Sequence, residues 1–148
     1  MIAPPPLLYG AAIIVGLALH VLHPLAITSR FVGVLHVVGI VLAVLGLLLS
    51  ATVVRAFGAA GTPVTPWRGT TRLVHAGPYR YSRNPDYIGQ TLVYVGIALV
   101  VNSWWLLILL PPVLLAVQLG VIRREERYLE AKFGAEYRDY TTRVRRWL

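Results

Sequence analysis

The sequence predicts an all-α integral membrane protein with four transmembrane helices and an amphipathic C-terminal tail. Hydrophobic residues make up 57% of the chain and its mean hydropathy is +0.66, whereas soluble domains contain about 45–50% apolar residues. No Asp or Glu precedes Asp86, and the basic residues lie beside long uncharged segments. The length of 148 residues fits a single domain over residues 1–148.

Two uncharged segments, Leu7 to Leu25 and Phe31 to Val54, open the chain. Each approaches or exceeds the roughly 20 residues that a helix needs to cross about 30 Å of hydrocarbon. Pro24 and the short link at residues 28–30 predict the end of the first helix and a tight connection. We therefore expect two N-terminal spans within residues 1–55, the first retained and not removed as a signal peptide.

The uncharged stretch from Tyr87 to Ile122 is too long for one span, because 36 helical residues would extend about 54 Å. We expect it to reverse at Asn102-Ser103 and form a tight hairpin of two short spans. Pro111-Pro112 predict a kink or a gap in the hydrogen bonds of the last span. Pairs of glycines at heptad spacing predict close helix packing; they are Gly39 and Gly46, and Gly89 and Gly96.

The tail from Arg123 to Leu148 is expected to be helical, amphipathic and cytoplasmic, lying along the inner membrane surface. Gly134 is expected to separate two helices. The apolar residues of the tail fall near one helical face; they are Leu129, Phe133, Tyr137, Tyr140 and Val144.

The distribution of basic residues predicts the orientation. Five Arg lie between the second and third spans and eight basic residues follow the fourth, whereas the other two links hold only Arg30. Both termini are therefore expected to be cytoplasmic, in the cell inner membrane. The net charge of +8 suits anionic lipid headgroups, and the basic residues do not form the continuous patch that nucleic acid would need. The absence of Cys excludes disulfides and thiolate metal sites.

Two polar clusters border the apolar hairpin. Asn84-Pro85-Asp86 has the pattern of a helix start, and either it only caps the third span or it belongs to a site with its neighbours Tyr79, Arg80, Tyr81, Arg83, Tyr87 and Gln90. Arg123 to Arg127 follows the fourth span and contains Glu125 and Glu126. This run is either an ordinary solvated helix end or a second part of the same site.

The segment from about Leu73 to Trp147 resembles the membrane-embedded methyltransferases that include isoprenylcysteine carboxyl methyltransferase and the phospholipid N-methyltransferases. The motifs occur in order: Gly-Pro-Tyr, Arg-Asn-Pro-Asp-Tyr-Ile-Gly, Asn-Ser-Trp, Glu-Glu and Phe-Gly-Ala-Glu-Tyr-Arg-Asp-Tyr. The resemblance implies an S-adenosylmethionine-dependent methyltransferase whose catalytic core is residues 56–148. Its acceptor would be a hydrophobic or amphiphilic molecule at the membrane, and no metal is implied.

The resemblance also implies the site residues. Expected cofactor contacts are Leu73, Val74, His75, Tyr79, Asn84, Pro85, Tyr87, Gln90 and Glu125. Expected catalytic residues are Arg83, Arg124 and Glu126. Arg83, Arg123 or Arg124 would hold an acceptor carboxylate, and Glu126, Asp86, His75 or Tyr81 would take a proton from an amine or hydroxyl. Val121 stands where the isoprenylcysteine branch carries Arg, and Asn84 where it usually carries His.

The acceptor and the class of protein have alternatives at this stage. The first reading is an isoprenylcysteine carboxyl methyltransferase-like enzyme, and the second is an N- or O-methyltransferase of a phospholipid, another lipid or a small molecule. A non-enzymatic scaffold or channel-like subunit is the rival, and it predicts no binding of S-adenosylmethionine. Nothing in the sequence sets the oligomeric state.

Overall fold

The computed structural model describes residues 4–63 and 71–148, and within these ranges the chain is helical with no strand beyond an isolated bridge between Ala26 and Ser103. The all-α prediction is therefore confirmed. The helices are α1 (Pro5–Leu22), α2 (Val32–Ala60), α3 (Pro85–Val101), α4 (Trp104–Val117), α5 (Arg123–Phe133) and α6 (Ala135–Arg143). A 3₁₀ turn covers Gly77–Arg80, and a π-helical turn, Gln118–Ile122, joins α4 to α5.

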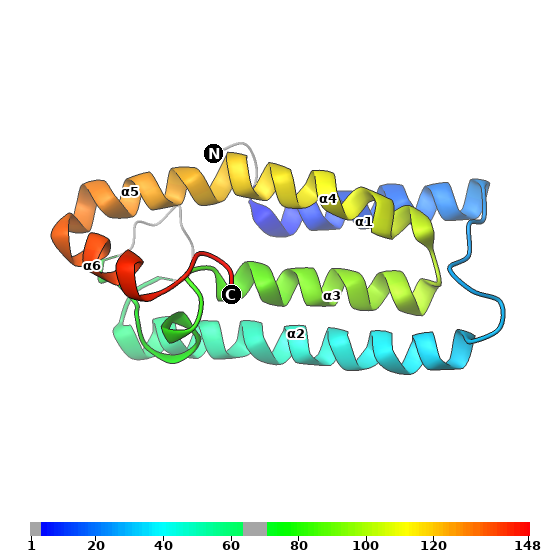
Figure 1. The fold of residues 1–148 in the computed structure, drawn as a ribbon, viewed down its shortest axis with the longest axis horizontal. Coiled ribbons are helices and arrows are strands. Elements are labelled where there is room, and N and C mark those ends of the chain that lie inside the picture. The colour runs from blue at the N-terminus through cyan, green and yellow to red at the C-terminus, as the bar shows by residue number, and fades with distance from the viewer. Residues whose placement is uncertain (1–3, 64–70) are drawn as a thin grey trace.

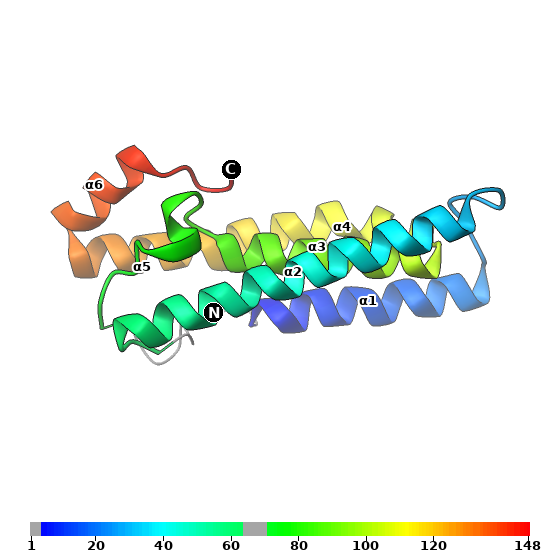
Figure 2. The ribbon, with the colours of Figure 1, turned by 90° about the horizontal axis from the view of Figure 1, so that it is seen from below.

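The first four helices lie along one long axis, and α5 continues the line of α4 (Figure 1). The view from below shows the same arrangement, with α6 turned back beside α5 (Figure 2). Three helical stretches are long and apolar enough to cross a membrane: α1, α2 and the continuous Trp104–Phe133. The helix α3 has 17 residues, about 26 Å at 1.5 Å per residue, so its crossing remains a prediction.

The ends of the first two helices differ from the expected ones. The helix α1 stops at Leu22, three residues before the expected end, with His23 at its C-cap. The helix α2 runs past Arg55 to Ala60 and ends at Gly61, whose φ of 64° is the left-handed conformation of a glycine cap. An arginine limits the apolar span but does not stop helical hydrogen bonding, which explains the difference.

The glycine pairs bring α2 and α3 into close contact, as expected. A Cβ on Gly46 would lie 2.5 Å from the carbonyl oxygen of Gly89, and one on Gly39 would lie 2.6 Å from that of Gly96. Real Cβ atoms do not approach oxygen so closely, so the two backbones touch at both levels. This packing places the end of α2 beside the start of α3.

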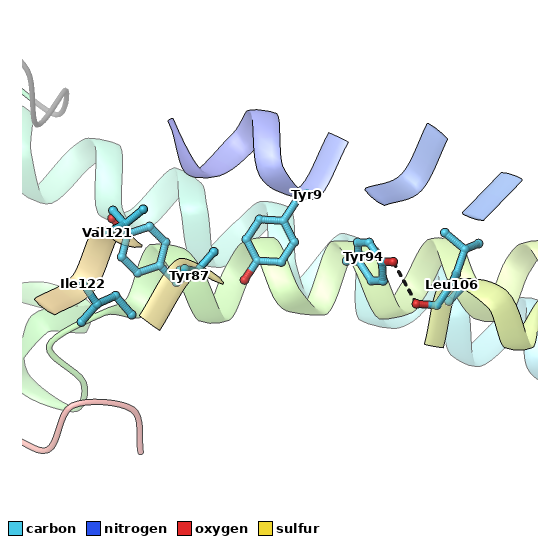
Figure 3. Packing of buried hydrophobic residues seen from close by; sticks show 8 residues of the cluster. Tyr9, Tyr87, Tyr94, Leu106, Val121 and Ile122 are labelled. Carbon is cyan, nitrogen blue, oxygen red and sulfur yellow. Dashed lines mark hydrogen bonds between the residues drawn. The ribbon is translucent and has the colours of Figure 1, made fainter. Parts of the chain in front are cut away.

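Tyrosines join the outer helices α1 and α4 to α3 in the core (Figure 3). The hydroxyl of Tyr94 donates to the carbonyl oxygen of Leu106 at 2.8 Å, and Tyr9 of α1 packs on Tyr94 with ring centroids 6.0 Å apart. The hydroxyls of Tyr9 and Thr91 are 2.9 Å apart. These contacts satisfy polar groups among apolar helices, where an unpaired hydroxyl would be costly.

The predicted hairpin reversal is confirmed at Asn102-Ser103, between α3 and α4. Asn102 adopts the left-handed conformation, with φ of 57°. Its side chain also ties the hairpin to the α1–α2 link: Oδ1 accepts from the amides of Ile27 and Thr28 at 3.0 and 3.1 Å, and Nδ2 donates to the carbonyl of Thr28 at 2.7 Å. One residue thus joins both connections at this end of the molecule.

Asn102→Ala is expected to destabilise the protein by about 2–4 kcal/mol. It removes three hydrogen bonds and places alanine in the left-handed backbone conformation, which alanine adopts less readily than asparagine. The measurement is the thermal unfolding midpoint of detergent-purified protein. Asn102→Gly keeps the backbone freedom and isolates the side-chain contribution. Unchanged midpoints in both variants would show that the hydrogen bonds of the Asn102 side chain do not stabilise the fold.

Pro111 and Pro112 lie inside α4, which does not end at either. The departure from regular α geometry comes at the π-helical turn that follows, Gln118–Ile122. In the tail, Gly134 has φ of 52° and separates α5 from α6, as predicted. The expected apolar residues of the tail do gather, but against the protein: Tyr137, Tyr140 and Val144 form a small core with Leu73, Leu129 and Phe133. The position of the tail along the membrane surface stays a prediction.

Candidate functional site

A cavity of ≈ 210 Å³ lies at the start of α3, between the 3₁₀ turn, the end of α2 and the first turns of α5. Nine of the residues expected in the site line it: Leu73, Val74, Tyr79, Arg83, Asn84, Tyr87, Gln90, Glu125 and Glu126. The remaining walls are Pro5, Pro6, Val53, Phe57, Asp86, Ile122, Leu129, Tyr137 and Tyr140. Residues before position 56 therefore contribute walls as well.

The two polar clusters meet in this cavity. The hydroxyl of Tyr87 donates to Glu125 Oε2 at 2.9 Å, and an Arg83 nitrogen lies 3.3 Å from Glu126 Oε1. Each contact joins the start of α3 to the start of α5. The polar cluster at α3 is therefore more than a helix cap.

The 3₁₀ turn places Tyr79 in the cavity wall. Gly77 begins the turn with φ of 59°, a conformation that favours glycine, and Pro78 follows it. Tyr79 packs edge-on against Phe57 with ring centroids 5.6 Å apart, and its carbonyl oxygen accepts from the Tyr140 hydroxyl at 2.7 Å. Burial raises the pKa of the Tyr79 hydroxyl above its ordinary value, and the nearby Glu125 carboxylate raises it further. Tyr79 is therefore a neutral aromatic wall at physiological pH.

Asn84 occupies the N-cap position of α3, as predicted, but its side chain does not cap the helix. Its Nδ2 instead donates to the carbonyl oxygen of Arg146 at 2.8 Å. The backbone amide of Arg83 donates to the carbonyl of Arg145 at 2.9 Å. The start of α3 is thereby fastened to the C-terminal tail, which comes back to this point (Figure 1).

The π-helical turn sets which residues of α5 face the cavity. Such a turn adds a residue to the helical register and is frequent at functional sites. Ile122, the last residue of the turn, lines the cavity, and so do Glu125, Glu126 and Leu129 of α5. Gly120 within the turn is buried, yet the sequence carries no periodic signal that would have located the change of register.

Glu126 is the centre of an ion cluster. Both of its carboxylate oxygens accept from the Arg146 guanidinium at 2.8 Å, in addition to the contact with Arg83. This hydrogen bonding raises the pKa of Arg146. A carboxylate held by two guanidinium groups is poorly placed to take a proton from an acceptor, so the geometry favours a positioning role for Glu126.

Three expected site residues do not line the cavity. Arg124 is exposed, because it lies on the opposite side of α5 from Leu129 and the cavity. His75 is exposed and lies near the Tyr140 ring in a different surface hollow. Pro85 is buried at the first position of α3 but forms no part of the wall. Sequence reasoning also missed Tyr137 and Tyr140, whose periodicity predicted a membrane-surface face.

Two polar atoms in the cavity residues are buried without a hydrogen-bond partner among the described residues: Gln90 Oε1 and Arg83 Nε. Asp86 Oδ2 accepts from Gln90 Nε2 at 2.7 Å, which fixes the amide and leaves its oxygen as a free acceptor. The Arg83 Nε–H is correspondingly a free donor. Buried polar groups are normally paired, so both atoms fit a polar ligand in the cavity.

Together the walls offer three acidic side chains, an amide acceptor and a guanidinium donor without partners among the described residues, four tyrosine rings and aliphatic side chains. This combination suits a ligand that carries positive charge, hydrogen-bonding groups and a flat ring.

Comparison with known proteins agrees with these features. The phospholipid methyltransferase family matches residues 34–136, which include α3, α4, α5 and both polar clusters. An uncharacterized protein of Haemophilus influenzae is 38% identical over 65 residues, which cover 38% of this chain and 100% of that protein. No solved structure matches the chain. From the family match over most of its length, together with its membrane-type helices, the chain belongs to the phospholipid methyltransferase family of membrane methyltransferases.

Proposed function

We propose that this protein binds S-adenosylmethionine in the cavity at the start of α3 and transfers its methyl group to an amphiphilic acceptor from the membrane. The observation that carries the proposal is the meeting of Tyr87 with Glu125 in a cavity with unpartnered buried polar atoms. Methyltransferases of this family generally use S-adenosylmethionine.

The residues fit that cofactor. Glu125 would bind its ammonium group or a neighbouring polar group, and Tyr87 holds the Glu125 carboxylate in place. The Gln90 oxygen is an acceptor for a hydroxyl or amino group. Tyr79 and Tyr87 supply aromatic faces for cationic or flat groups, and Leu73 and Val74 supply an apolar wall for the adenine.

When bound, S-adenosylmethionine supplies a methyl group already activated by its sulfonium leaving group. The protein therefore acts mainly by holding the two reactants in line and excluding water. Arg83 is the residue we assign to an anionic group of the acceptor, because its Nε–H is free while Glu126 fixes the other side of the guanidinium. A carboxylate acceptor needs no general base, whereas an amine or hydroxyl must lose a proton.

In this proposal both termini lie on the cytoplasmic side of the cell inner membrane, because basic residues are retained on that side and both Arg83 and the Arg-rich tail lie at the cavity end of the bundle (Figure 1). The cavity then opens where soluble cofactor is present, and the acceptor arrives from the lipid. Two acceptor classes remain candidates: a prenylated carboxylate and a lipid with an amine or hydroxyl.

Methyl transfer tests this proposal directly. Purified protein reconstituted with a membrane lipid extract is incubated with S-adenosylmethionine labelled in its methyl group, with and without N-acetyl-S-farnesylcysteine. We expect label in the lipid phase or in the methyl ester of the added compound, and the product identifies the acceptor class. If folded protein gives neither product nor measurable binding of S-adenosylmethionine, the scaffold reading is preferred.

A further inference from the structure

A second hollow of ≈ 520 Å³ lies between the first turns of α3 and the second half of α4. Its walls include Ile88 and Leu92 of α3, Leu114 and Leu115 of α4, and Trp147 of the C-terminal tail. Among the residues that the structure describes, no charged side chain lines it. We call this hollow the α3–α4 groove.

The two polar wall residues of the groove are already engaged. Thr91 Oγ1 donates to the carbonyl of Tyr87 at 2.7 Å, and the Gln118 amide oxygen accepts from Trp147 Nε1 at 3.2 Å. A polar group that entered the groove would lose its hydrogen bonds to water and gain mainly contacts with apolar side chains, which is unfavourable. The groove therefore suits an apolar chain.

The groove opens on a face that a membrane would cover. Leu115, in its wall, is 59% exposed and belongs to the membrane-type stretch Trp104–Phe133. The α4 side extends from Pro111 to Gln118, about 10 Å along the helix. An apolar chain can thus enter sideways from lipid.

The groove also adjoins the cofactor cavity. Thr91 of the groove lies one helical turn after Tyr87 of the cavity, and Gln118 lies one turn before Ile122. At the tail, Trp147 lines the groove while the preceding residue, Arg146, binds Glu126 at the cavity. The two hollows are therefore neighbours along α3 and along the continuous helical stretch that contains α4 and α5.

Charge indicates what the head of such a chain should carry. Arg83 and Arg146 share one carboxylate, Glu126, whereas the other two carboxylates of the cavity, Glu125 and Asp86, accept hydrogen bonds from Tyr87 and Gln90. The Arg83 Nε–H has no hydrogen-bond partner within residues 4–63 and 71–148. An acidic head group, carboxylate or phosphate, complements both features.

Building on the methyl transfer proposed above, we propose that the α3–α4 groove holds the apolar chain of an acceptor with one such chain and an anionic group, carboxylate or phosphate, in its head, and that Trp147 determines which chains fit. Trp147 is suited to this because it is a large rigid wall, packed against the main core and fixed by Gln118. Its exchange for a smaller side chain enlarges the groove without touching the cofactor walls.

Photolabelling of the wild-type protein in phosphatidylcholine nanodiscs tests the location. The probes are N-acetyl-S-farnesylcysteine and lysophosphatidylethanolamine, each carrying a diazirine in its apolar chain, and labelled peptides are mapped by mass spectrometry. We expect labelling of residues 111–118 and of the tail that excess unlabelled probe abolishes. The probe that labels in this saturable way identifies carboxylate or phosphate as the head group.

Variants of Trp147 test its role. Unlabelled N-acetyl-S-farnesylcysteine and its longer analogue N-acetyl-S-geranylgeranylcysteine are compared as competitors of the photolabelling. For Trp147→Ala we expect the concentration of the farnesyl compound that halves labelling to rise about tenfold relative to that of the geranylgeranyl compound, since an aromatic wall is lost. Trp147→Phe should keep most of the wild-type preference. Leu148→Ala is the matched control, because Leu148 is 80% exposed and does not line the groove.

Calorimetric titration with S-adenosylmethionine separates the two proposals. Binding of the cofactor by the wild type and by Trp147→Ala, without saturable labelling of the groove by either probe, would overturn the groove proposal alone. Unchanged chain preference in folded Trp147→Ala would overturn the role of Trp147. Saturable labelling without any binding of S-adenosylmethionine would instead contradict the methyltransferase proposal and leave a lipid-binding groove.

Discussion

Glu125→Gln is expected to weaken binding of S-adenosylmethionine by about ten- to a hundredfold. Hydrogen bonds to charged groups contribute about 1.5–3 kcal/mol, and each 1.4 kcal/mol is a factor of ten in affinity. Glutamine keeps the shape of the side chain and can still accept from the Tyr87 hydroxyl, so the contact between α3 and α5 survives. What is lost is the negative charge that we assign to the cationic part of the cofactor.

The matched control is Glu130→Gln on the same helix. Glu130 is half-exposed, faces Arg138 at 3.8 Å and lies outside the cavity. Its replacement should leave the dissociation constant within about a factor of two, because exposed ion pairs contribute little. Equal losses in both variants, or no loss in Glu125→Gln at an unchanged melting temperature, would remove Glu125 from the cofactor site.

Gly46→Ala is expected to destabilise the protein by about 1–3 kcal/mol or more, because the new Cβ would lie 2.5 Å from the Gly89 carbonyl oxygen and force α2 away from α3. The displacement should also reach the cofactor site, since Val53 and Phe57 of α2 line it. The thermal unfolding midpoint and the affinity for S-adenosylmethionine should therefore fall together.

Gly58→Ala, on the same helix, should have the opposite sign. A Cβ there would meet no atom of the described residues within 4 Å, and alanine in a helix is more stable than glycine by about 0.5–1 kcal/mol. A rise in the midpoint for Gly58→Ala together with a fall for Gly46→Ala identifies backbone contact as the cause. Similar shifts in the two variants would show that α2 and α3 adjust freely to the added group.

The sequence predicts those parts of the fold that follow from a local residue signal or from a repeating pattern of residues. An uncharged stretch longer than a membrane requires a reversal, and Asn102-Ser103 is the one polar pair near its middle. Heptad-spaced glycines predict the α2–α3 contact because only small residues allow it. The end of α2 was misplaced because the pattern of charges reports the membrane border, whereas Gly61 ends the helix.

The sequence predicts which segments form the candidate site, but it does not predict which side of each helix faces the cavity. The polar residues at the start of α3 and the glutamates after α4 pointed to one place, and the cavity joins them. Neighbouring Arg124 and Glu125 have similar local context, and the π-helical turn decides which of them faces inward. The contact of Arg146 with Glu126 has no signal in spacing, because the tail reaches it through tertiary packing.

Hydrogen–deuterium exchange of the wild-type protein with and without S-adenosylmethionine tests the central claim most directly, because it reports binding and location together. The account predicts that the cofactor slows exchange in residues 79–90 and in residues 122–130 at once, and leaves the α1–α2 link at residues 23–31 unchanged. Slowed exchange in neither segment at saturating cofactor, or protection confined to other parts of the chain, would contradict it.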